Sequence, residues 1–121
     1  MILVAGLSKR EFEKVEAWLH ERRGQSTKSK RAQYAGDEDV LVNFRRRANG
    51  NETTTADIVY LDLTKHVDAL GAAIRGGRFN AKWSDGVAEG CAQKIGDAVN
   101  LLVILMAVAH EEDPIDLGDD S

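Results

Sequence analysis

Two polar side chains lie in the most apolar part of the chain. Residues 98–109 read AVNLLVILMAVA, in which the one polar residue, Asn100, follows Asp97 by three positions. A helix that is apolar on nearly all its faces must be buried on nearly all of them, so we expect Asp97 and Asn100 to be withdrawn from water with it. They are therefore the best candidates for a binding site. The alternative is a buried polar contact that fixes helix register or oligomeric state.

A second polar pair precedes the first in the sequence. Asp62 and His66 are four residues apart in a segment of helical spacing, so they share one strip of a helix surface. If the two helices pack antiparallel, this strip and that of Asp97 and Asn100 can converge on one pocket, with Lys65 at its rim. The alternative is a surface pair in which Asp62 accepts a hydrogen bond from His66.

The first helix that the sequence predicts has a well-defined start. Ser8 and Glu11 form a capping box, so the helix should begin at residue 8 or 9, with Leu7 and Phe12 as a hydrophobic staple. Gly24 is its expected end, and residues 24–36 are expected to be a polar loop. The residues that follow one another at helical spacing are Phe12, Val15, Trp18, Leu19 and Arg22.

A short second helix and a long third one are expected next. Acidic residues 37–39 suit the start of the short helix and basic residues 45–47 its end, before Asn49–Asn51, because they match the helix dipole. Its buried stripe would be Val40, Leu41 and Phe44. The third helix begins at a second capping box, Thr54 with Asp57, and stops at Gly76–Gly77. Its expected core face is Tyr60, Leu63, Val67, Leu70 and Ile74.

The fourth helix carries two apolar stripes. One consists of Cys91, Ile95, Ala98, Leu102, Leu105 and Ala109, and the other of Leu101, Ile104 and Val108. One stripe can face the core, and a second subunit is the simplest partner for the other. The sequence thus predicts an all-α, four-helix domain over residues 1–112, with three main helices and one short one, that forms a homo-oligomer through its C-terminal helix. Residues 113–121 are expected to be a disordered acidic tail.

Composition narrows the functional classes. The 121 residues are 43% apolar and 30% charged, as in ordinary single-domain soluble proteins. The net charge is −4, so nucleic acid is not an expected partner. The basic run 22–31 is expected to be a mobile connector, and the alternative is that it contacts phosphates. The single cysteine fits a reducing cytoplasm, and the apolar run of the last helix is shorter than the roughly 20 residues of a membrane span. Nucleotide-loop, zinc-binding and serine-hydrolase motifs are absent from the sequence.

Three segments together resemble a known group of proteins. They are YAGDEDVLVNFRRRA at 34–48, LTKHVDAL at 63–70 and QKIGDAVNLLVIL at 93–105. In this order they are similar to small phage-encoded proteins associated with nucleotide modification. They are more distantly similar to the MazG-like all-α nucleoside triphosphate pyrophosphatases, which hold Mg²⁺ with acidic pairs on two helices. The resemblance implies a nucleotide ligand and a place in the cytoplasm of a bacterial host.

The resemblance also implies roles for individual residues. Lys65, His66 and Arg45 or Arg46 would contact phosphates, Asn43 and Asn100 the edge of a base, and Tyr34 its face. The expected Mg²⁺ ligands are Asp39, Asp62 and Asp97, of which Asp39 and Asp97 could instead contact ribose hydroxyls. The MazG-like pattern has an acid three residues before Asp97, where this chain has Lys94.

Lys94 leaves three functions open. The first is metal-dependent release of pyrophosphate from a nucleoside triphosphate, with acids other than the usual pair. The second is a non-catalytic sponge that sequesters a host signalling nucleotide, such as a cyclic dinucleotide, as an anti-defence protein. The third is an inhibitor that binds a host protein through the uncovered apolar stripe or the basic run.

Overall fold

The computed structural model describes residues 6–33, 41–80 and 90–118. These residues form four α-helices and no strand: α1 (Lys9–Gln33), α2 (Val42–Gly50), α3 (Thr55–Arg75) and α4 (Cys91–Glu112). The prediction of an all-α chain with three long helices and one short one is confirmed. Residues 113–118, at the start of the predicted tail, follow α4 as an exposed non-helical segment.

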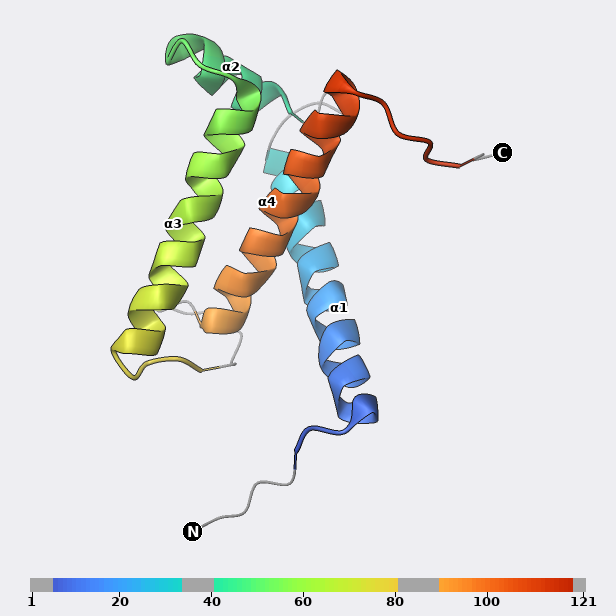
Figure 1. Cartoon of the computed structure of the whole chain (residues 1–121), viewed down its shortest axis with the longest axis vertical. Coiled ribbons are helices and arrows are strands. Elements are labelled where there is room, and N and C mark those ends of the chain that lie inside the picture. Colours follow the sequence, from blue (N-terminus) through green and yellow to red (C-terminus); the bar gives the residue numbers. More distant parts are fainter. Residues whose placement is uncertain (1–5, 34–40, 81–89, 119–121) are drawn as a thin grey trace.

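Helix α4 occupies the centre of the arrangement. It packs mainly against α3, which runs in the opposite direction, and it also contacts α1 on another side (Figure 1). Helix α2 packs on α3 at the end of the structure where α3 begins and α4 ends. The antiparallel packing of α3 and α4, on which a shared pocket depends, is therefore present.

Local interactions explain where α1 and α3 start and where α3 stops. The Ser8 and Thr54 hydroxyls accept hydrogen bonds from the backbone N–H groups of Glu11 and Asp57, each at 3.1 Å, which confirms both capping predictions. After α3, Gly77 takes the left-handed conformation with φ of 70°. The N–H of Arg78 then donates to the Ala73 carbonyl at 2.8 Å, as in a Schellman motif.

The predicted end of α1 at Gly24 is wrong, because the helix continues to Gln33. A glycine inside a helix costs only about 1 kcal/mol relative to alanine, and the residues that follow it permit helix. The polar loop expected from residue 24 is thus helical as far as 33. The expected staple and the N-terminal part of the apolar stripe of α1 are exposed to solvent, since Leu7, Phe12 and Val15 are 62%, 60% and 57% exposed.

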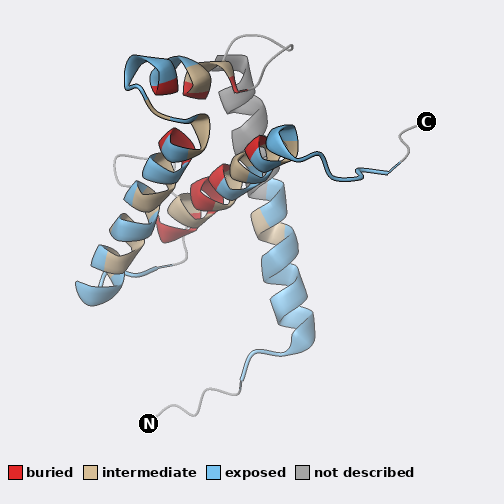
Figure 2. Ribbon diagram, turned by 45° about the horizontal axis from the view of Figure 1, so that its top comes forward, coloured by how far each residue is buried: buried red, intermediate tan, exposed pale blue. Residues whose placement is uncertain are grey.

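The core lies where α2 meets α3 and α4. Its buried side chains come from three helices and the residue before α2: Leu41, Phe44, Ala48, Ile58, Val59, Leu101 and Val108. Figure 2 shows the buried positions gathered on α2, on the first part of α3 and along α4. The short helix α2 is therefore an integral part of the core, and its buried residues Leu41 and Phe44 were predicted correctly.

The predicted core faces of α3 and α4 need correction. On α3, Val59 is fully buried, whereas Tyr60, Val67 and Ile74 are more than half exposed, so the helix is rotated from the expected face. On α4, both stripes contribute buried residues: Leu101 and Val108 from one and Cys91 and Ala98 from the other, whereas Leu102 is 51% exposed. A helix that is apolar on nearly all sides gives no sequence signal for which stripe faces inward.

Helix α4 is also long and apolar enough to cross a membrane, judged by length and composition. Core helices of soluble proteins meet the same criterion. In this structure, 44% of the most apolar 18-residue stretch of α4 is buried. Ionisable and amide side chains are costly within a bilayer, and α4 carries Gln93, Lys94, Asp97 and Asn100. Its character is that of a packed helix with a polar strip.

Phe44→Ala should destabilise the fold by about 3–5 kcal/mol, because it removes a large side chain from the junction of α2, α3 and α4. The matched control is Phe12→Ala on α1, where the ring is already 60% exposed and the expected change is below about 1 kcal/mol. Urea denaturation followed by circular dichroism measures both. Equal losses for the two variants would show that the core is not centred on α2.

Candidate functional site

Asp97 faces the interior of the structure. It is 6% exposed and is the one charged residue in the buried class among those that the structure describes. It precedes Leu101 by four residues and Val108 by eleven, and at 100° per residue all three fall on one strip of α4. Because Leu101 and Val108 belong to the core, Asp97 lies on the same inward side. Its predicted withdrawal from water is confirmed, and Asn100 is half-buried one turn further on.

The antiparallel packing of α3 and α4 allows the turns that carry His66 and Asp97 to lie on the same side of the core cluster. Leu63 of α3 packs against the same core cluster as Leu101 of α4. One turn further from that cluster, α3 reaches His66 and α4 reaches Asp97. His66 is half-buried and Lys65 is exposed beside it. The convergence of the two polar strips on one pocket stays a prediction.

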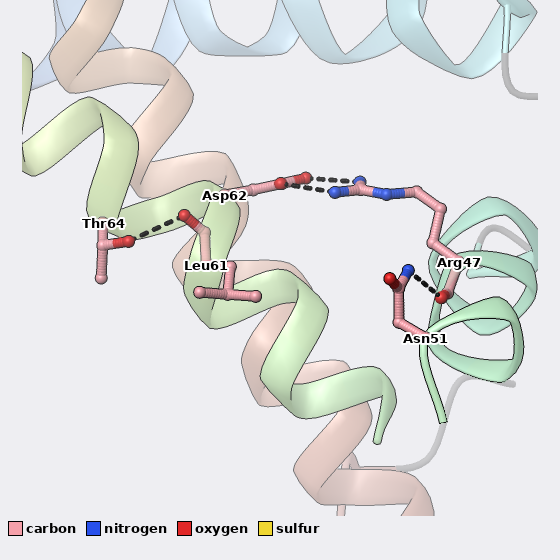
Figure 3. A network of polar contacts seen from close by, with 5 residues as sticks. All are labelled: Arg47, Asn51, Leu61, Asp62 and Thr64. Atoms are coloured by element: carbon pink, nitrogen blue, oxygen red, sulfur yellow. Dashed lines mark hydrogen bonds and ion pairs between the residues drawn. The ribbon is translucent and has the colours of Figure 1, made fainter. Parts of the chain in front are cut away.

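Asp62 is engaged by α2. Both of its carboxylate oxygens accept hydrogen bonds from the Arg47 guanidinium, at 2.7 and 2.8 Å (Figure 3). The expected surface pair with His66 is thus replaced by a bidentate ion pair between two helices. The hydrogen bonds and charge of Arg47 hold the pKa of Asp62 below its usual value, and the charges of Lys65 and His66 add to this effect against the opposing effect of burial.

The arginine run of α2 is mostly structural. Arg47 binds Asp62 of α3, and Arg45 binds Glu111 of α4 at 2.6 Å. The side chain of Asn51 donates to the Arg47 carbonyl at 2.8 Å and so holds the end of the same helix (Figure 3). These contacts fix α2 across α3 and α4. Of the two arginines expected at phosphates, Arg45 is therefore tied to a carboxylate, whereas Arg46 is exposed.

Several predicted binding residues remain available. Asn43, Arg46, Lys65 and His66 make no hydrogen bond or ion pair with the residues that the structure describes. Lys65 and His66 nevertheless lie close enough to Asp62 to act on its charge. With Arg47 they place three basic side chains around one carboxylate, an arrangement that favours an additional anion.

Gln93 is a polar residue of this region that the sequence analysis missed. Its side-chain oxygen Oε1 is buried and accepts no hydrogen bond from the part of the chain that the structure describes. It precedes Asp97 by four residues, so Gln93, Asp97 and Asn100 follow one another along a single strip of α4 over roughly 10 Å. The available sequence signal was this spacing, in which Gln93 is the position one turn before the candidate acid.

The described residues alone do not assemble a Mg²⁺ site. Such an ion needs several oxygen ligands, usually with more than one carboxylate. Among the described residues, no three His, Cys, Asp or Glu side chains lie together as a metal site requires. Arg47 already occupies both oxygens of Asp62, and Lys94 precedes Asp97. Two predicted residues, Tyr34 and Asp39, lie outside the described part of the chain.

No family model, curated protein or solved structure matches the chain. The resemblance to phage and MazG-like proteins thus rests on the three sequence segments alone. The function must be argued from the geometry of the site.

Asp62→Asn should lower the free energy of unfolding by about 1 kcal/mol at pH 7, a small value because water screens the half-exposed Arg47. Since folding lowers the pKa of Asp62, its contribution is complete above the ordinary value of 3.8 and is lost as pH falls through the folded-state pKa. Urea denaturation of both proteins between pH 7 and pH 2.5 should show the difference disappearing. A difference that persists unchanged at pH 2.5 would contradict the ion pair.

Proposed function

We propose that this protein binds a nucleotide at the interface of α3 and α4 and releases it chemically unchanged. The observation that carries the proposal is the burial of Asp97 on the inward strip of α4, which packs against α3, the helix that carries Lys65 and His66. A buried carboxylate on one helix and basic groups on its antiparallel neighbour suit a ligand with a polar base or sugar at one end and phosphates at the other.

Each part of the ligand has a chemical match. Lys65 supplies a cationic donor and His66 a ring N–H donor for phosphate oxygens, and the Arg47–Asp62 pair holds the turn of α3 just before them. Asp97 and Asn100 supply acceptors and donors for ribose hydroxyls or a base edge. The resemblance to MazG-like proteins points to the same two groups of residues.

Binding without hydrolysis follows from the donor set. Metal-assisted attack on a triphosphate requires carboxylates free to hold the ion. Of the expected acids, Asp62 is bound by Arg47, and Asp97 has a lysine in place of its acidic partner. The proposal is therefore closest to the nucleotide sponge, with phosphate charge offset by basic side chains.

Isothermal titration of the whole chain with nucleoside triphosphates and cyclic dinucleotides, with Mg²⁺ and with EDTA, tests the proposal. Binding in EDTA with the ligand recovered intact would support it. Lack of binding by every nucleotide would overturn it, and Mg²⁺-dependent release of pyrophosphate would show that the protein is an enzyme.

Lys65→Ala should weaken binding of the tightest ligand about tenfold, which corresponds to roughly 1.4 kcal/mol for a lost charged hydrogen bond at an exposed position. Lys9→Ala is the matched control, because Lys9 is an exposed lysine of α1 that forms only a helical ion pair with Glu13. The control should bind as the wild type does. Equal affinities for the two variants would remove Lys65 from the site.

A second function, self-association through α4, is favoured by a different observation. Leu102, Val103 and Met106 are each about half exposed and form one stripe, and no charged residue lies between 98 and 109. We propose a second copy of this chain as the occupant, since an uncharged stripe on a central helix can pair with itself about a twofold axis. The homo-oligomer expected from the sequence would then use this stripe in place of Leu101, Ile104 and Val108.

Met106→Glu should shift the chain from dimer to monomer in sedimentation velocity, because it places a charge within the stripe. Glu112→Gln is a control at an exposed position of the same helix and should leave the mass unchanged. A wild-type protein that is monomeric at 100 μM would contradict self-association. A monomer that binds a host protein through the same stripe would instead support the inhibitor.

A further inference from the structure

The buried oxygen of Gln93 is an unusual feature of this helix. A buried polar atom without a partner costs free energy, and native structures rarely keep one unless a ligand, water or conformational change satisfies it. The oxygen itself is buried, but Gln93 as a whole is only half-buried, so rotation of its flexible side chain can turn this oxygen toward a bound molecule. The unsatisfied group is an acceptor, and it therefore requires an N–H or O–H donor.

Asp97 provides further acceptors on the same strip. A carboxylate has about four acceptor positions, so it can bind a ligand in addition to contacts within the protein. Gln93 and Asp97 are four residues apart, about 6 Å along the helix axis. This spacing allows one planar group to lie across both side chains.

We propose that Gln93 and Asp97 select guanine as the base of the bound nucleotide, an inference that rests on the proposed function. On its Watson–Crick edge guanine presents two adjacent donors, the ring N1–H and the exocyclic 2-amino group. Adenine and cytosine present an amino group beside a ring acceptor, and uracil presents one donor between two carbonyl oxygens. Two acceptor side chains on one strip complement guanine best. Asp97 accepts from N1–H and from one hydrogen of the amino group, and Gln93 Oε1 accepts from the other.

Titration of the whole chain with GTP, ITP and ATP tests the choice of base. ITP differs from GTP only by the absence of the 2-amino group, so its phosphates and sugar serve as an internal control. GTP should bind at least tenfold more tightly than ITP or ATP. If GTP and ITP bind equally, guanine selection is wrong although nucleotide binding stands; if none of the nucleotides binds, the proposed function itself is wrong.

Gln93→Leu then tests the residue. It should weaken GTP binding about tenfold and leave ITP binding unchanged, because only GTP offers the donor that Gln93 accepts. Gln93→Glu keeps the acceptor and should preserve the preference for GTP. The melting temperature of the free Gln93→Leu protein should equal or exceed that of the wild type, since the unpaired buried acceptor is gone. Equal losses for GTP and ITP in Gln93→Leu would show that the residue has only a structural role.

Discussion

The placement of α4 between α3 and α1 determines where every polar group of the site lies. Because α4 is apolar on nearly all sides, it is packed against two other helices, and the polar residues that it carries are drawn inward with it. Asp97 is the clearest case, since it shares a strip with core residues Leu101 and Val108. A carboxylate is costly to bury unless it has partners, and Asp97 does interact with other groups of the protein.

Helix α2 couples the core to the site. Its apolar side, with Phe44 and Ala48, closes the end of the α3–α4 pair, while Arg45 and Arg47 bind carboxylates on α4 and α3. The arginine run that resembles a phosphate clamp in the sequence thus mainly orients the helices. The hydrogen bonds from Arg47 anchor Asp62, which lies one turn before His66 on α3. The basic groups of α3 therefore lie next to a turn that is fixed to α2.

Local signals in the sequence predicted local structure well. Ser8, Thr54 and the Gly76–Gly77 pair mark helix ends whose hydrogen bonds form within a few residues, so no distant contact is needed to interpret them. The inward-facing sides were harder to predict. The face of α3 that is buried, with Ile58 and Val59, is set by tertiary packing with α2 and α4. Whether Leu101 or Leu102 of α4 is buried likewise depends on which side of α4 each neighbouring helix packs against. The role of Arg47 and the unpaired oxygen of Gln93 likewise depend on tertiary contacts.

We propose that the α3–α4 interface, and not the exposed apolar stripe of α4, receives a nucleotide. Backbone amide NMR spectra of the ¹⁵N-labelled protein, recorded during titration with GTP, test this most directly because they report on every helix at once. The account predicts that shift changes concentrate at residues 62–66 of α3 and 93–100 of α4. Changes confined to Leu102, Val103 and Met106, or unchanged spectra at millimolar GTP, would contradict it.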